Sequence, residues 1–115
     1  MATALANSLN QTLKSVTTDS TQLTIIAGGY VQIGNLVIVN IRFSVTAADT
    51  LISFNTNLPT SINQNKQYIP CNIIDIQGDT YSESFGYKQH STNGFVVKVP
   101  KANQEYALHC AYICA

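Results

Sequence analysis

Residues 36–45 restrict the possible folds of this chain more than any other segment. Apolar residues recur there at every second position, and the residues between them form a second, more polar face. The first face consists of Val37, Val39, Ile41, Phe43 and Val45, and the second includes Asn40, Arg42 and Ser44. A period of two is typical of a β-strand with one buried face. Because Gly34-Asn35 separates this run from a shorter one at residues 30–33, the sequence predicts a β-hairpin.

Short strand patterns separated by turn signals continue through residues 22–115. Asn93-Gly94 is a second strong turn dipeptide. The final strand pattern, at residues 104–114, is apolar on both faces, which is typical of a central strand or of one that meets another subunit. Roughly seven or eight short strands with no βαβ pattern predict an all-β fold. We expect an antiparallel β-sandwich, jelly-roll-like, as the single head domain over residues 22–115.

The first 21 residues have a different pattern. Leu5, Leu9, Leu13 and Val16 recur at spacings of four, four and three, with mostly polar residues between them. This is the stripe of a short amphipathic helix, which needs a packing partner to be stable in water. The sequence therefore predicts an N-terminal helix and linker over residues 1–21, packed on its own domain or on other copies of itself.

Charged residues are scarce and balanced. They make up 10% of the chain, against about 25% in ordinary globular proteins, and the formal net charge is zero. Such a chain has no electrostatic attraction to phosphate backbones or anionic lipid, so we expect no nucleic-acid partner. Neither a membrane-spanning apolar run nor a signal-peptide pattern is present, so we expect no membrane insertion. Zero net charge also favours contact between identical molecules.

The predicted hairpin resembles a known family. Gly28-Gly29-Tyr30, the Gly34-Asn35 turn and the long Val/Ile strand after it are similar to the C-terminal head domains of bacteriophage or prophage tail-fibre and baseplate receptor-binding proteins. The resemblance covers the hairpin closely and the rest of the chain in general pattern. It implies a non-catalytic homotrimer that recognises a host-surface saccharide, in the virion tail or made in the bacterial cytoplasm from a prophage.

Two other functions fit the same residues. One is a purely structural trimerisation or virion decoration domain, whose strands serve assembly only. The other is a monomeric bacterial carbohydrate-binding module that works beside an enzyme.

No pattern of a catalytic or cofactor site is present, and we expect neither an enzyme nor a cofactor. The chain has no Gly-x-Ser-x-Gly elbow, phosphate loop or calcium loop. Asp75, Asp79 and Glu83 surround one predicted turn, as paired catalytic carboxylates can, but carboxylates that merely flank a hairpin lie in the same way.

The three cysteines are expected to be buried thiols. Cys110 and Cys114 share one face of the last strand, about 13 Å apart, so they cannot bond to each other without a sharp bend. Strand alternation points His109 away from both of them, and we therefore predict no metal site.

Residues 80–90 alternate aromatic rings with small polar groups. Tyr81, Phe85 and Tyr87 share one strand face. Aromatic rings stack on the C–H faces of sugars, and polar side chains bond to sugar hydroxyls, so a neutral glycan fits this composition. The alternative is that Phe85 and its facing partners belong to the core. The predicted ligand-binding residues are Tyr81, Tyr87, His90, Asp79 and Asn93.

The polar face of residues 36–45 is also a candidate subunit interface. It carries Arg42, the only arginine of the chain, together with Leu36 and Ile38. Such a mixed stripe suits contact between subunits, because the planar guanidinium pairs well with carboxylates and carbonyls. The predicted interface residues are Leu5, Leu9, Leu36, Ile38 and Arg42.

Overall fold

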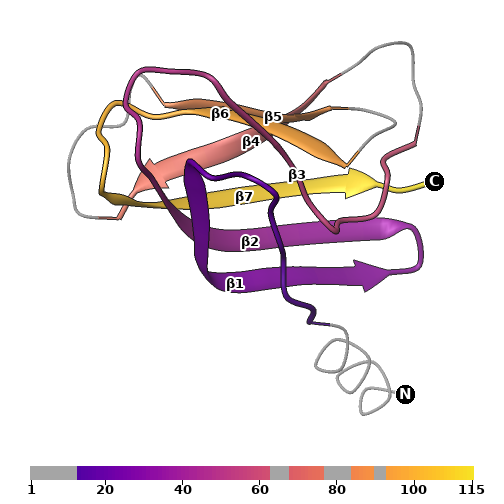
Figure 1. The fold of residues 1–115 in the computed structure, drawn as a ribbon. Helices are drawn as coiled ribbons and strands as arrows, with labels where there is room; N and C mark the ends of the chain where they lie inside the picture. The colour runs from indigo at the N-terminus through magenta and orange to yellow at the C-terminus, as the bar shows by residue number, and fades with distance from the viewer. Residues whose placement is uncertain (1–12, 63–67, 77–83, 90–92) are drawn as a thin grey trace.

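The regular elements of the described chain are all antiparallel β-strands. The computed structural model describes residues 13–62, 68–76, 84–89 and 93–115. Within them lie β1 (Leu23–Ile33), β2 (Leu36–Val45), β3 (Ile52–Asn55), β4 (Tyr68–Asp75), β5 (Phe85–Gln89), β6 (Gly94–Lys98) and β7 (Glu105–Ile113). They form one sheet in the order β1-β2-β7-β4-β5-β6-β3 (Figure 1). The prediction of an all-β, antiparallel fold is confirmed.

Strand β4 joins the two halves of this sheet. Its second half, residues 72–75, pairs with β7, and its first half, residues 68–71, pairs with β5. The sheet is therefore continuous and curls into a half-barrel (Figure 1). The predicted sandwich is not confirmed, because alternation shows only that one face of each strand is buried. A curled sheet meets that condition as well as two stacked sheets do.

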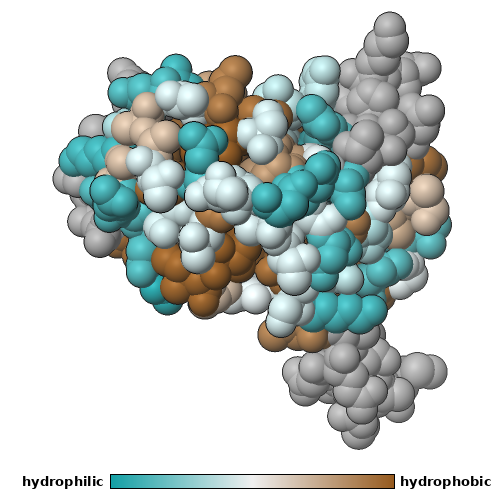
Figure 2. All heavy atoms as spheres, viewed as in Figure 1, coloured by the Kyte–Doolittle hydropathy of each residue, from teal (hydrophilic) through white to brown (hydrophobic). Residues whose placement is uncertain are grey.

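The predicted β1–β2 hairpin is confirmed. Ile33 pairs with Leu36 across the turn, and Gly34 has a φ of 59°, a backbone conformation that glycine adopts without strain. Within β1, the register shifts between Ile25 and Ala27, which marks a β-bulge. The strand bends beside this bulge, and Figure 2 shows hydrophobic residues gathering near the bend.

The concave face of the sheet holds the core. All five predicted apolar residues of β2 are buried, each at most 5% exposed. The ring of Phe43 stacks on Tyr106 of β7, with centroids 5.9 Å apart. Strand β7 lies between β2 and β4, so the first of the two alternatives for this strand, a central position, is confirmed.

The described part of the predicted N-terminal helix and linker, residues 13–21, contains no helix, and residues 1–12 lie outside the described residues. Lys14 forms an antiparallel bridge with Tyr30 of β1, and Thr18 forms one with Thr56, directly after β3. Because β1 and β3 are the two edges of the sheet, this segment lies across the opening between them (Figure 1). Edge strands offer unpaired backbone groups, and an extended segment can bond to both edges where a helix could not.

Asp19 fastens the same segment to β3. Its carboxylate accepts hydrogen bonds from the backbone N–H of Asn55 at 2.8 Å and from the Asn55 amide at 3.1 Å. These bonds lower the pKa of the Asp19 carboxyl from 3.8. Of the predicted helical stripe, Val16 is buried here whereas Leu13 stays 64% exposed.

Candidate functional site

Strand β5 turns its aromatic face outward. Phe85 is 43% exposed and Tyr87 is half-buried, whereas Lys88 faces the core and is fully buried. The interpretation of Phe85 as a core residue is therefore wrong. The rings of Phe85 and Tyr87 are therefore available to a ligand.

Tyr68, Pro70, Phe85 and Tyr87 form a surface that we call the aromatic platform. Tyr68 of β4 is 60% exposed, and its ring lies 4.8 Å from that of Tyr87, centroid to centroid, at an angle of 57°. Pro70 is the cross-strand partner of Tyr87, and Phe85 lies on the same face two residues before Tyr87. Exposed rings with phenol hydroxyls offer both an apolar stacking surface and polar tips.

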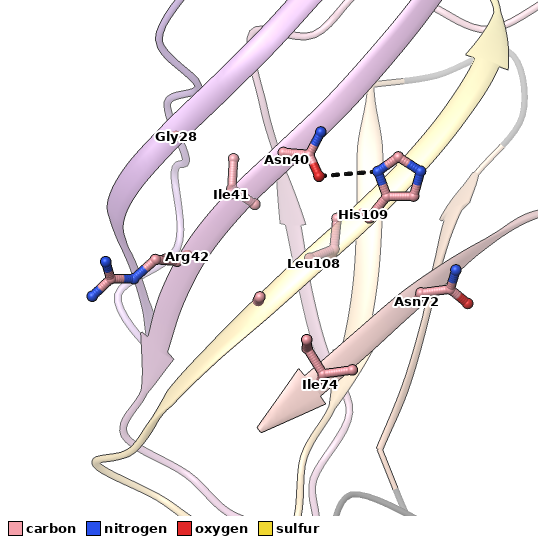
Figure 3. A pocket seen from close by; sticks show the side chains of 9 residues that line it. Gly28, Asn40, Ile41, Arg42, Asn72, Ile74, Leu108 and His109 are labelled. Carbon is pink, nitrogen blue, oxygen red and sulfur yellow. Dashed lines mark hydrogen bonds between the residues drawn. The ribbon is translucent and has the colours of Figure 1, made fainter. Parts of the chain in front are cut away.

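A groove of about 360 Å³ lies on the outer face of the neighbouring strands β2, β7 and β4. The side chains around it include Asn40, Arg42, Asn72, Ile74, Ala107 and His109 (Figure 3). Gly28 closes the β1 side. A Cβ atom there would lie 2.2 Å from the backbone oxygen of Asn40, and the φ of Gly28 is 91°, so only glycine fits.

Three polar side chains cross the groove in one row. Asn40 pairs with His109 across β2 and β7, and Asn72 of β4 pairs with His109 on its other side. His109 Nδ1 lies 3.0 Å from Asn40 Oδ1 (Figure 3). Because an amide oxygen only accepts, this contact assigns a hydrogen to Nδ1 of His109. The row thus offers donors and acceptors that suit an uncharged polar ligand.

The groove and the aromatic platform share strand β4. Asn72 follows Pro70 by two residues on the same face, a step of about 7 Å. An elongated ligand can therefore contact both surfaces at once.

Arg42 is paired within its own chain. Its Nη2 lies 2.6 Å from Glu105 Oε2, so the two charges offset each other at the rim of the groove. Both side chains are substantially exposed, and such an ion pair contributes at most about 1 kcal/mol to stability.

The other predicted interface residues of this face lie beside an apolar surface. Leu36 is 37% exposed and pairs with Ile33 on one side and Ile113 on the other, which are 40% and 48% exposed. We call these three residues the aliphatic row. Ile38, one step inward along β2, is half-buried.

The structure brings only part of the predicted site together. Tyr87 lies in the aromatic platform, but the amide of Asn93 donates to the backbone oxygen of Thr56 at 2.6 Å and fastens the start of β6 to the segment after β3. Asp75 is buried and accepts a bond from Gln104 Nε2 at 2.5 Å. The predicted residues that lie outside the described residues are Leu5, Leu9, Asp79, Tyr81 and His90.

Sequence reasoning missed Tyr68 as well as the row of Asn40, His109 and Asn72. The alternation of β4 does place Tyr68, Asn72 and Ile74 on one face, and that signal was available. The alternation does not show which strands are neighbours, because that depends on the pairing and register of the sheet.

Lys88 lies inside the curled sheet, among aromatic rings. Its Nζ is 4.8 Å from the ring centroid of Tyr112 and 5.8 Å from that of Phe95, and it donates to the backbone oxygen of Gln89 at 3.3 Å. Burial lowers the pKa of the Lys88 ammonium from 10.5 to about 8. The three cysteines are also buried and free, as predicted.

Comparison of the chain with protein-family models, curated proteins and solved structures finds no match. Across the described ranges, no group of three His, Cys, Asp or Glu side chains is arranged to hold a metal ion. The same part of the chain contains no helix that is long and apolar enough to cross a membrane.

Proposed function

We propose that this chain is a non-catalytic recognition domain of the phage-tail type, which binds a host-surface saccharide. The observation that carries the proposal is the outward aromatic platform, whose strand β4 continues into the polar groove. Stacking rings and an uncharged row of amide and imidazole groups are what a neutral glycan needs from a protein surface.

The burial pattern of β5 supports this function. Strand β5 exposes Phe85 and buries Lys88, and the neighbouring strand β4 exposes Tyr68, which reverses the usual partition of these residue types. An exposed aromatic cluster is typical of an interaction site, since folding alone favours the opposite arrangement.

The proposed assembly is a homotrimer that uses the aliphatic row. Three exposed aliphatic side chains on adjacent strands form a continuous apolar strip at the hairpin end of the sheet. Zero net charge leaves no strong repulsion between copies, so a second and third copy of this chain are the proposed occupants.

A glycan-array measurement followed by titration calorimetry on the best hit tests the binding function. We expect Tyr68→Ala and Tyr87→Ala each to weaken binding roughly tenfold, which is about 1.4 kcal/mol. Leu51→Ala is the control, because Leu51 is 57% exposed in the loop before β3 and lies outside the platform. If both tyrosine variants bind the glycan as tightly as the wild type, or if the wild type binds no glycan, the purely structural alternative is favoured.

Light scattering across a dilution series tests the assembly. The wild type is expected to keep three times the mass of one chain, and Leu36→Ser with Ile113→Ser is expected to dissociate it. A wild-type monomer that still binds glycan would instead indicate the carbohydrate-binding module.

A further inference from the structure

Cys71 of β4 and Cys110 of β7 occupy opposite positions of neighbouring strands. The last register pair of these antiparallel strands is Asn72 with His109, so the next position places Cys71 opposite Cys110. Both side chains face the core and are 8% and 3% exposed. Directly opposed strand residues have Cα atoms about 4.5–5.5 Å apart, which lies within the span of roughly 4.4–6.8 Å that a disulfide bridges.

The two thiols are in contact with each other. A side-chain hydrogen bond between Cys71 and Cys110 raises the pKa of Cys71 and lowers that of Cys110. The Cys71 sulfur also lies 3.8 Å from the backbone oxygen of Ile69. The positive charge of Lys88 lowers the pKa of Cys110 further. Cys110 is therefore the better nucleophile of the pair, and Cys71 is placed to attack it in turn.

We infer that Cys71 and Cys110 form a cross-strand disulfide when the protein meets a small peroxide oxidant. The Cys110 thiolate attacks one peroxide oxygen, the O–O bond breaks, and Cys110 becomes a sulfenic acid while the departing hydroxide takes a proton and leaves as water. The sulfur of Cys71 then attacks the Cys110 sulfur, an S–S bond forms, and the S–O bond breaks. The Cys71 proton leaves with that oxygen as the second water.

Cys114 is not a partner in this reaction. It lies four residues beyond Cys110, a distance of about 13 Å along an extended strand, and its sulfur contacts Gln32 Nε2 at 3.5 Å. This inference is independent of the proposed glycan site. The bond would lock β4 to β7 at the position where β4 changes its partner from β5 to β7.

Treatment of the full chain with hydrogen peroxide, followed by thiol counting in denaturant, tests the inference. We expect the number of reactive thiols to fall from three to one, with the loss of two hydrogen atoms in the intact mass and no change in oligomer size. A reductant is expected to restore all three. Three remaining thiols, oxygen added to the mass, or a disulfide between chains would overturn the inference.

A variant identifies the bonded pair. Trypsin leaves Cys71 in residues 67–88 and both other cysteines in residues 102–115, so a cross-linked peptide alone does not identify the partner. Cys114→Ser is expected to form the same cross-link and to lose both of its remaining thiols. If Cys114→Ser keeps two reactive thiols, the assignment to Cys110 is wrong. Neither measurement depends on a variant of the buried pair being able to fold.

Discussion

Strands β2 and β5 use the same alternation in opposite ways. On β2, the inward residues are hydrocarbon and aromatic side chains such as Phe43, and the outward residues include Asn40 and Arg42. On β5, the inward residues are Gly86 and Lys88, and the outward residues include Phe85 and Tyr87. Strand β2 buries its apolar side chains, whereas strand β5 exposes its aromatic side chains.

This difference separates residues that stabilise the fold from residues that are free to serve another purpose. The apolar face of β2 supplies the hydrophobic stabilisation that any small domain needs. Strand β5 places an ammonium group in the core and leaves two aromatic rings at the surface, which weakens the fold at both faces. Its arrangement is understandable if the surface rings bind a ligand.

Removing a phenyl ring from each strand gives the largest expected contrast. Phe43→Ala removes a fully buried ring that stacks on Tyr106 and should lower the free energy of unfolding by about 3–5 kcal/mol. Phe85→Ala is the matched variant, and because its ring is 43% exposed it should lower that free energy by about 1 kcal/mol or less. Urea denaturation measures both. Equal losses would mean that the outward face of β5 is part of the core.

Replacing the buried lysine should stabilise the protein. Lys88→Met keeps the length of the side chain and removes an ammonium whose pKa falls from 10.5 to about 8 on folding. That shift in pKa corresponds to an increase of up to about 3 kcal/mol in the free energy of unfolding of the variant at pH 7. Lys14→Met, at an exposed position of the N-terminal segment, is the control.

The gain from Lys88→Met should depend on pH. Below about pH 8, Lys88 is protonated in the folded and in the unfolded protein, so burial of the ammonium destabilises the wild type by its full amount. Between about pH 8 and 10.5 the unfolded chain binds more protons at this residue than the folded one, so wild-type stability approaches that of the variant. Urea midpoints of both proteins at several pH values measure this. A gain that stays constant up to pH 10.5 would show that Lys88 binds its proton equally in both states, so that folding does not lower its pKa.

The outward face of β2 should give the smallest effect. Arg42→Ala removes an ion pair with Glu105 in which both side chains are well exposed, and we expect a loss of less than about 1 kcal/mol. Added salt should diminish even this difference, because it screens exposed charges. A larger, salt-independent loss in urea denaturation would mean that Arg42 contributes mainly through packing of its side chain.

The predictions that succeeded concern residues near one another in the chain. The hairpin, the buried face of β2 and the position of His109 on the face opposite Cys110 all follow from turn chemistry and from a period of two. The sandwich was not confirmed, and residues 13–21 are extended, because both depend on which strand edges are left open for pairing.

The candidate site divides in the same way. Alternation alone places Phe85 and Tyr87 on one face of β5, and Tyr68, Asn72 and Ile74 on one face of β4. It does not place Tyr68 beside Tyr87, since that contact depends on the register between β4 and β5.

The sequence by itself determined which residues share a face, because covalent geometry sends successive side chains of a strand to opposite sides. Only the tertiary structure decided which face of β5 points inward, which strands are neighbours, and how Lys88 comes to lie near two cysteines. These outcomes depend on contacts between residues far apart in the chain, where the burial available in the whole core outweighs the preference of any single side chain.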